Sequence, residues 1–223
     1  MHVVISCKDI MKVFGSGEAA VQALRGISFE IKAAENVAIM GPSGSGKSTL
    51  LQVIGCLDLP TSGQYCLDGV DVQTLDDDRL SELRGQYIGF VFQSFHLLPR
   101  LTLLENVALP LYYQDIEKSE RLEKAQEALE LVRLGGRSSH KPHQLSGGEK
   151  QRGAIARAMI HKPRLLLADE PTGNLDSGVK GEILDYLTLM NETQNVTLVM
   201  VTHDDETAAR AKRIINLKDG KVV

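Results

Sequence analysis

The chain has 223 residues, 43% hydrophobic and 24% charged, with a formal net charge of −4. This is ordinary globular composition for one domain, and an acidic balance without a long Lys/Arg run disfavours direct binding to nucleic acid or to an anionic bilayer. Its apolar runs, such as residues 165–168, are far shorter than the ~18 residues of a membrane span, and its start lacks a secretory signal pattern, so a cytosolic location is expected.

Short strands dominate the predicted first part of the chain. Apolar runs bounded by glycine and polar turns predict strands at residues 3–6, 27–31 and 37–40. The third strand leads directly into a glycine-rich segment, after which a helix is predicted from Lys47 to Ile54. Two further strands, at 64–67 and 70–72, flank Asp68-Gly69, a dipeptide typical of a tight hairpin.

Helical periodicity replaces strand alternation from about residue 94 to residue 160. Apolar residues there recur at steps of three, four and three, which places them on one face of a charged helix: Leu122, Ala125, Leu129 and Val132. We therefore expect a helical subdomain over residues 94–160.

The α/β pattern returns after this insert. A strand is predicted at 165–167, a helix near 180–191, a β-branched strand at 196–201 and two final strands within 214–222. The prediction is one domain, in which residues 1–93 and 161–223 form an α/β core with a β subdomain and residues 94–160 form the helical subdomain.

A phosphate-binding loop is predicted between the strand at 37–40 and the helix from Lys47. The segment matches G-x-x-x-x-G-K-[ST] in its required context and consists of Gly41, Pro42, Ser43, Gly44, Ser45, Gly46, Lys47 and Ser48. Its glycines let backbone N–H groups approach phosphate oxygens at a helix N-terminus. Lys47 is expected to reach the β and γ phosphates of a nucleotide and Ser48 to hold Mg²⁺, with Thr49 completing the nucleotide-binding set.

Two adjacent carboxylates, Asp169 and Glu170, end the apolar run that begins at Leu165. Such a pair can place one acid near a metal and the other near water, and Asp169 is expected to meet Mg²⁺ directly or through water. A solvated turn at a strand end would give the same pattern. The catalytic interpretation of the pair therefore depends on a second motif, which precedes it in the chain by about twenty residues.

That motif is Leu145-Ser146-Gly147-Gly148-Glu149. A serine and two glycines just before a helix can bind phosphate through hydroxyl and backbone N–H groups. The five residues resemble the signature of the ABC ATPase family. The order of motifs from Phe14 to His203 is similar to the nucleotide-binding domain of that family, and the resemblance covers nearly the whole chain.

The resemblance implies a P-loop NTPase (RecA-like) core with an antiparallel β subdomain and an inserted α-helical subdomain. It also implies a head-to-tail dimer of two copies, in which Ser146, Gly147, Gly148 and Glu149 of one copy close over ATP held by the other. The chain would then be an ATPase with ATP and Mg²⁺ as its ligands.

Further site roles follow from the resemblance alone. Glu170 would orient or deprotonate the attacking water, His203 would contact the γ phosphate, and Gln93 would bind magnesium and water while sensing a membrane partner. Asp176 would lie in a loop that communicates across the dimer, and Phe14 would stack on adenine.

Two positions depart from the family pattern. Phe14 stands where the family often has Tyr, which removes a hydroxyl. Gly153 stands inside a predicted helix where a larger apolar residue is typical, and glycine there costs ~1 kcal/mol relative to alanine unless the backbone must pack closely.

Residues 54–58, 89–93 and 104–111 look like the macrolide-export and lipoprotein-release group of this family. That resemblance implies a separate integral membrane permease, attachment to the cytoplasmic face of the inner membrane through it and, for export, a periplasmic adaptor. The alternative is a regulatory ATPase that drives a non-transporting membrane partner, as in divisome-type systems. A soluble ATPase of DNA repair or ribosomes is disfavoured, because the chain lacks a second cassette, a long coiled coil and basic extensions.

Overall fold

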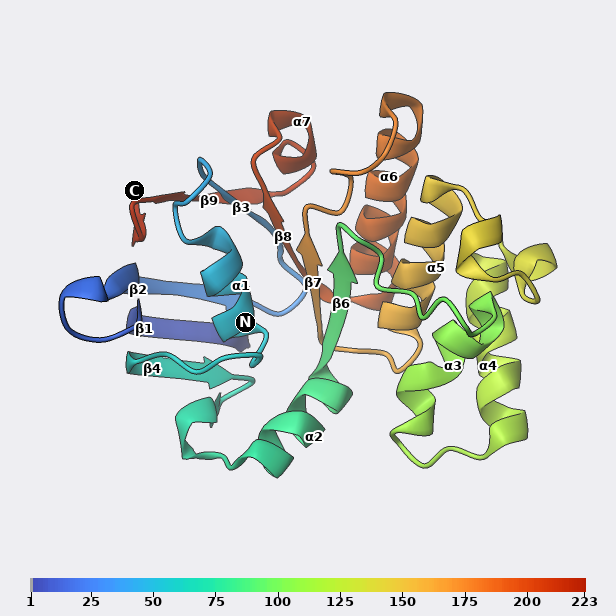
Figure 1. Cartoon of the computed structure of the whole chain (residues 1–223), viewed down its shortest axis with the longest axis horizontal. Coiled ribbons are helices and arrows are strands. Elements are labelled where there is room, and N and C mark those ends of the chain that lie inside the picture. The colour runs from blue at the N-terminus through green and yellow to red at the C-terminus, as the bar shows by residue number, and fades with distance from the viewer. Residues whose placement is uncertain (1) are drawn as a thin grey trace.

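Two β-sheets and a helical lobe make up the computed structural model, which describes residues 2–223 (Figure 1). The predicted fold class, an α/β core with an antiparallel subdomain and a helical insert, is confirmed. Among the described residues, no helix has both the length and the apolar character needed to cross a bilayer.

The first sheet is antiparallel, with strand order β2-β1-β4-β5. Its strands are β1 (Val3–Phe14), β2 (Val21–Lys32), β4 (Ser62–Leu67) and β5 (Val70–Asp71). β1 is much longer than the predicted strand at 3–6, because its register shifts between Cys7 and Ile10 and Asp9 has a φ of 50°, which interrupts the alternation. The β4–β5 hairpin turns at Asp68 and Gly69, both with positive φ, as the dipeptide predicted.

The second sheet has the strand order β10-β9-β3-β8-β7-β6, and its strands are parallel except for β10. The strands are β3 (Asn36–Met40), β6 (Ile88–Phe92), β7 (Leu165–Asp169), β8 (Thr197–Thr202), β9 (Arg213–Lys218) and β10 (Lys221–Val222). The four strands β3, β8, β7 and β6 point the same way, so their carboxyl ends share one edge of the sheet.

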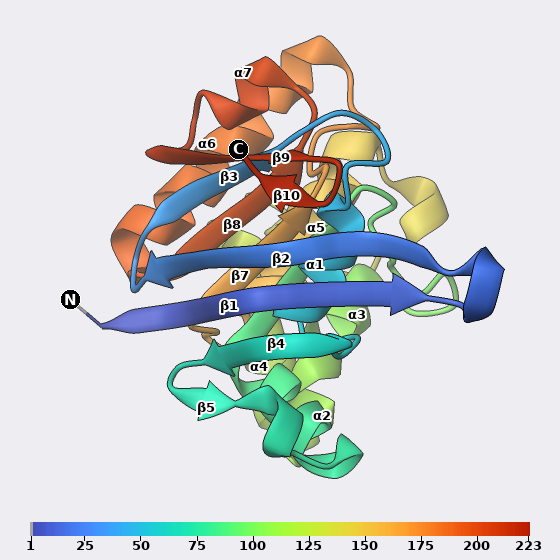
Figure 2. The same cartoon turned by 90° about the vertical axis from the view of Figure 1, so that its left-hand side faces the viewer.

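Helix α1 (Lys47–Ile54) lies between the two sheets, and β1 and β2 cross in front of it in Figure 2. Leu50, Leu51, Val53 and Ile54 are all buried, because the helix is covered on both sides. Helices α6 (Ser177–Gln194) and α7 (Asp205–Ala208) pack at the other face of the parallel sheet.

The short helix α2 (Asp77–Tyr87) was not anticipated from the sequence. A start signal was present: the Asp76 side chain accepts a hydrogen bond from the Arg79 N–H, and two further aspartates occupy the first turn. Its apolar face is narrow, with only Leu80 and Leu83 buried, so the helical periodicity is weak.

The helical lobe has a core of its own. Helices α3 (Leu103–Tyr112) and α4 (Lys118–Leu131) bury apolar residues against one another and against α5 (Gly147–Met159). Of the predicted helical face, Ala125, Leu129 and Val132 are buried. Helix α5 also packs on β6, so it joins the lobe to the parallel sheet.

The packing of α3 on α5 explains Gly153. A Cβ at this position would lie 2.6 Å from Cδ1 of Leu103, and Leu103 is fully buried. The glycine therefore lets the two helices approach closely, which offsets its low helix propensity.

A similar close approach occurs at Gly89 in β6. A Cβ there would lie 2.3 Å from the backbone oxygen of Ala158 in α5, which has no freedom to move aside. We expect Gly89→Ala to lower the free energy of unfolding by about 2 kcal/mol, the scale of overpacking in a core. Urea unfolding measures this change in the free energy of unfolding. Gly85→Ala in α2 is the control, because a Cβ at Gly85 meets open space and alanine is favoured over glycine in a helix by ~1 kcal/mol. Equal stability of the two variants would contradict the proposed contact.

Candidate functional site

The predicted site residues gather at the carboxyl edge of the parallel sheet. In the register of the strands Met40 pairs with Thr202, and Asp169 pairs with both Val201 and Phe92. The segments that follow β3, β6, β7 and β8 therefore begin side by side. This edge is where open α/β sheets bind ligands.

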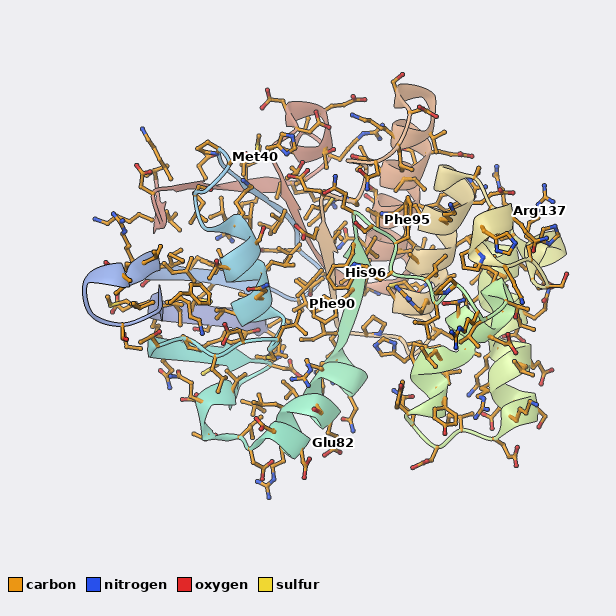
Figure 3. All side chains as sticks on the ribbon, in the orientation of Figure 1. Met40, Glu82, Phe90, Phe95, His96 and Arg137 are labelled. Atoms are coloured by element: carbon orange, nitrogen blue, oxygen red, sulfur yellow. The ribbon has the colours of Figure 1, made fainter. Side chains whose placement is uncertain are left out.

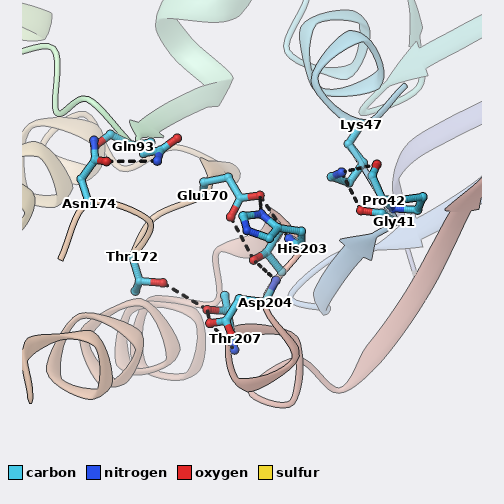
Figure 4. A network of polar contacts seen from close by, with 11 residues as sticks. Gly41, Pro42, Lys47, Gln93, Glu170, Thr172, Asn174, His203, Asp204 and Thr207 are labelled. Carbon is cyan, nitrogen blue, oxygen red and sulfur yellow. Dashed lines mark hydrogen bonds and ion pairs between the residues drawn. The ribbon is translucent and has the colours of Figure 1, made fainter. Parts of the chain in front are cut away.

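The phosphate loop connects β3 to α1 and places Lys47 in the first turn of the helix. Gly46 has a φ of 100°, and a Cβ there would lie 2.6 Å from the Ala23 carbonyl oxygen, so only glycine fits. Lys47 is 9% exposed as a residue, and its ammonium donates to the carbonyl oxygens of Gly41 at 2.7 Å and Pro42 at 2.9 Å (Figure 4). The loop thus holds a positive charge beside a helix N-terminus, which suits a polyphosphate.

A cavity of about 650 Å³ unites this loop with the acidic pair and the histidine. Of the predicted residues it is lined by Ser43, Gly44, Gly46, Lys47, Ser48, Thr49, Asp169, Glu170 and His203. Its other walls come from residues that carry no motif and that were not predicted as site residues: Val21, Gln22, Ala23, Arg25, Val201, Asp219 and Gly220. These residues reach the cavity because the antiparallel sheet contacts the C-terminal hairpin, where the Arg25 N–H donates to the Gly220 carbonyl at 2.8 Å.

Glu170 is held in an unusual backbone conformation just after β7. Its φ is 44°, a region that costs of order 1 kcal/mol for a side chain of this type. One carboxylate oxygen accepts from the His203 N–H at 3.1 Å and contacts the His203 ring Nδ1 at 2.5 Å, while the other accepts from the Thr202 hydroxyl at 3.2 Å. The turn therefore aims the carboxylate at the end of β8 (Figure 4).

Asp169 lies beside Glu170 in the same cavity wall. Burial, and then the neighbouring charge of Glu170, raise the pKa of the Asp169 carboxyl, while Lys47 lowers it. A nearby cation would stabilise the ionised, carboxylate form of these two adjacent acids, because it offsets the repulsion between their charges. Asp169 and the Ser48 hydroxyl supply the hard oxygen donors that Mg²⁺ prefers.

Among the side chains that the structure describes, no group of three or more His, Cys, Asp or Glu residues is placed to hold a metal ion. Mg²⁺ is commonly bound by one or two protein oxygens together with substrate phosphates.

Gln93 lies just outside the cavity, at the end of β6. Its Nε2 donates to Oδ1 of Asn174 at 3.1 Å, and Nδ2 of Asn174 donates to the Gln93 carbonyl at 3.1 Å (Figure 4). A Cβ at Gly173 would lie 2.7 Å from the Gln93 Nε2, so the glycine makes room for the amide. The Asn174 contact was not predicted, although the loop that carries it was singled out.

The Leu145 to Glu149 motif does not share this cavity. Ser146 caps α5: its hydroxyl accepts from the Glu149 N–H at 3.2 Å, and the Glu149 carboxylate accepts from the Ser146 N–H at 2.8 Å. The bond from the Ser146 backbone is the main reason that the pKa of Glu149 is lowered. Gly148 packs against α6, where a Cβ would lie 2.6 Å from Val179 Cγ1.

Phe14 and Asp176 also lie outside the cavity lining. Phe14 ends β1, is 42% exposed and lies under the Lys12 ammonium, 5.2 Å from the ring centre. It pairs in the sheet with Val21, which does line the cavity. Asp176 immediately precedes α6. Their predicted contacts with nucleotide remain predictions.

A second hollow lies between the sheet and the helical lobe. It is a groove of about 1210 Å³ whose walls come from α2, β6, α3 and α5. Apolar side chains such as Phe90, Leu109 and Tyr113 line it together with Glu82 and Arg157. Tyr113 is 76% exposed at this groove.

Comparison with known proteins agrees with this geometry. Residues 24–173 match the family described as ABC transporter. An uncharacterized ABC transporter ATP-binding protein of Thermotoga maritima is 50% identical over 222 residues, covering 100% of this chain and 94% of that protein. The macrolide export ATP-binding/permease protein MacB of Rhodopirellula baltica is 50% identical over 98% of this chain, which spans 32% of MacB.

A solved structure is also similar. The dimeric post-hydrolysis state of the ATP-binding cassette MJ0796 bound to ADP and Pi superposes with a TM-score of 0.90 at 47% identity, covering 98% of this chain and 96% of that chain.

Proposed function

Since this chain belongs to the ABC transporter family of ATP-binding proteins, we propose that it is the ATP-hydrolysing subunit that powers a membrane permease on a separate chain. The chain is an ATPase, and its reaction converts ATP and water to ADP and phosphate. The relatives of matching length support a permease on its own chain, whereas the name of MacB joins ATP-binding and permease functions in one protein.

The chemical roles follow from the cavity. Lys47 and the N-terminal turn of α1 bind the β and γ phosphates, and Ser48 contacts the phosphates and a magnesium ion. Glu170 takes a proton from the attacking water, because its carboxylate is fixed at the edge of the cavity by three hydrogen-bonding contacts. His203 bonds Glu170 and contacts the γ phosphate.

Asp169, Ser48 and Gln93 are the residues proposed to hold Mg²⁺, which when bound neutralises charge on the transferred phosphoryl group. Two of the three line the cavity, and Gln93 begins the segment beside it. The Asn174 side chain orients the Gln93 amide through its two hydrogen bonds.

We further propose that two copies bind head to tail around two ATP molecules. Ser146, Gly147 and Gly148 lie outside the cavity that holds Lys47, so they would reach the nucleotide of the partner copy. The dimeric MJ0796 cassette with ADP and Pi supports this arrangement. Each closure of the two-fold pair would enclose two equivalent sites.

The observation that supports a permease partner is the groove between β6 and the helical lobe. It is large, apolar and lies between β6 and the helical lobe, so an occupant would contact the segment that follows Gln93. A short helix of a permease fits such a groove. The chain would then be peripheral on the cytoplasmic face of the membrane, held there by the permease.

The name of the MacB relatives, macrolide export, supports export as the work performed. We propose that the substrates are amphipathic compounds or lipoproteins, and that a periplasmic adaptor is an additional partner. The same ATP site would serve a regulatory ATPase whose membrane partner moves no substrate. The substrate class therefore depends on the partner.

Two adjacent tyrosines allow a matched test. Tyr113 lines the groove, whereas Tyr112 is 56% exposed and contacts the Arg121 guanidinium. We expect Tyr113→Glu to weaken association with the proposed permease by at least about tenfold, because it places a charge in an apolar contact. Tyr112→Glu should bind within about threefold of wild type.

Association is measured by co-purification of the two tagged subunits from membranes, and hydrolysis by the purified ATPase checks that the nucleotide site is intact. Equal binding by both variants would place the permease elsewhere. Reconstitution in vesicles separates the two kinds of work, because export predicts ATP-dependent movement of an amphipathic substrate, whereas a regulatory partner predicts stimulated hydrolysis without movement.

A further inference from the structure

The segment that leaves Gln93 contains two consecutive left-handed residues. Phe95 has a φ of 61° and His96 a φ of 48°, and neither is glycine. Side chains with a Cβ disfavour this conformation, and two in succession are rarer still. Both residues lie on the connection between β6 and the lobe (Figure 3), so an interaction must hold this turn in place.

Arg157 of α5 provides that interaction. Its guanidinium donates to the carbonyl oxygens of both residues, from Nη2 to Phe95 at 2.8 Å and from Nη1 to His96. The His96 ring also rests on Phe92, with ring centres 4.6 Å apart. A planar guanidinium can reach two carbonyls in this way, which the single ammonium of lysine cannot do with the same geometry.

Among the side chains that the structure describes, no carboxylate forms an ion pair with Arg157, whose guanidinium donates to the carbonyl oxygens of Phe95 and His96. Burial lowers the pKa of its guanidinium, although the group stays charged at neutral pH. Arg157 is partly buried, and its partners are two backbone carbonyls of the turn. Its charge therefore stabilises the conformation of that turn more than it stabilises the helix that carries it.

Helix α5 connects this contact to a distant part of the site. It begins directly after Ser146, and Arg157 follows eleven positions later, about 16 Å along the axis. The same helix therefore carries the serine proposed to meet the partner's ATP and the arginine that holds the turn after Gln93. His96 and Arg157 also line the groove.

We propose that Arg157 is a positioning residue for Gln93, which it fixes by holding the Phe95–His96 turn to the helix that begins at the signature motif. Asn174 orients the Gln93 side chain from one side, and Arg157 restrains the backbone that follows it from the other. The inference rests on the proposed role of Gln93 as a magnesium ligand. A displacement of that ligand by about 1 Å would lower turnover by roughly ten- to a hundredfold.

The test compares Arg157→Met, Arg157→Lys and the double variant Arg157→Met/His96→Gly by their turnover and by the Mg²⁺ concentration that gives half-maximal ATP hydrolysis. We expect Arg157→Met to lower kcat by at least about tenfold and to raise the required Mg²⁺ several-fold, with KM for ATP at saturating Mg²⁺ within about twofold. Arg157→Lys should be intermediate. Glycine adopts the left-handed conformation freely, so His96→Gly should recover several-fold of the lost turnover.

Arg210→Met is the control, because this arginine forms an exposed ion pair with Asp185 of α6, has no bond to Phe95 or His96 among the described contacts, and should behave as wild type. The proposal is overturned if Arg157→Met keeps the wild-type Mg²⁺ requirement. It is also overturned if the variant only loses thermal stability and His96→Gly restores no activity, since that pattern indicates a purely structural contact.

Gln93→Ala is measured alongside. If Gln93→Ala leaves the Mg²⁺ requirement unchanged, the proposed metal role of Gln93 fails, whatever Arg157→Met does. If Gln93→Ala shifts it and Arg157→Met does not, the positioning role of Arg157 fails by itself.

Discussion

Glu170→Gln should lower kcat for ATP hydrolysis by about 10²- to 10³-fold while ATP binding stays within a fewfold of wild type. The amide has the same shape as the carboxylate and can still accept from the His203 N–H, so the turn after β7 should persist. It cannot take a proton from water, and loss of a general base costs this much. ATP-bound dimer should therefore accumulate, and size-exclusion chromatography with light scattering in the presence of ATP and Mg²⁺ would measure it.

Asp205→Asn is the matched control for this variant. Asp205 is an exposed carboxylate only two residues from His203, and its loss should leave kcat within about twofold of wild type. A wild-type rate in Glu170→Gln would remove Glu170 from the catalytic role. A similar loss in both variants would indicate a general effect of charge near the phosphates.

Ser146→Arg should abolish ATP-dependent dimerisation and lower hydrolysis by at least about a hundredfold, the scale of losing a positioned donor to the reacting group. Ser146 is exposed at the start of α5. In the proposed dimer an arginine there would occupy the space that the ATP of the partner copy fills. Binding of ATP to the monomer should be unchanged, because the cavity that contains Lys47 is lined by other residues. Light scattering measures the dimer, and a fluorescent ATP analogue measures binding.

Two inactive variants can test the trans arrangement directly. Ser146→Arg retains an intact phosphate loop and Lys47→Ala retains an intact signature, so a mixed dimer contains one complete site. An equal mixture should recover activity, to at most about a quarter of wild type if sites are independent. Ser146→Ala controls for the lost helix cap, which costs about 1 kcal/mol. Absence of any recovery, with mixed dimers shown to form, would contradict the head-to-tail model.

The sequence anticipated the phosphate loop, the acidic pair and the signature because each is a continuous motif whose chemistry depends on neighbouring residues. The family, the fold class and ATPase activity are confirmed. Strand lengths were harder to predict, since the bulges in β1 break the alternation that marks a strand. Helix α2 was missed because it buries only two apolar residues.

Several parts of the site have no signature in the sequence. The cavity walls formed by Ala23 and Gly220 depend on how the antiparallel sheet meets the C-terminal hairpin. Asn174 bonds Gln93 across 81 positions, and Glu170 bonds His203 across 33. The reason for Gly153 also became visible only in its contact with Leu103.

The sequence by itself determined which chemical groups are candidates for binding phosphate and magnesium, because a glycine loop before a helix or a carboxylate after a buried strand works through local geometry. Only the tertiary structure decided which of these groups meet. The parallel register brings the loop, Asp169, Glu170 and His203 to one edge of the sheet, while Ser146 stays on a helix outside that cavity. Long-range contacts of this kind depend on sheet register and on helix packing, which no local pattern encodes.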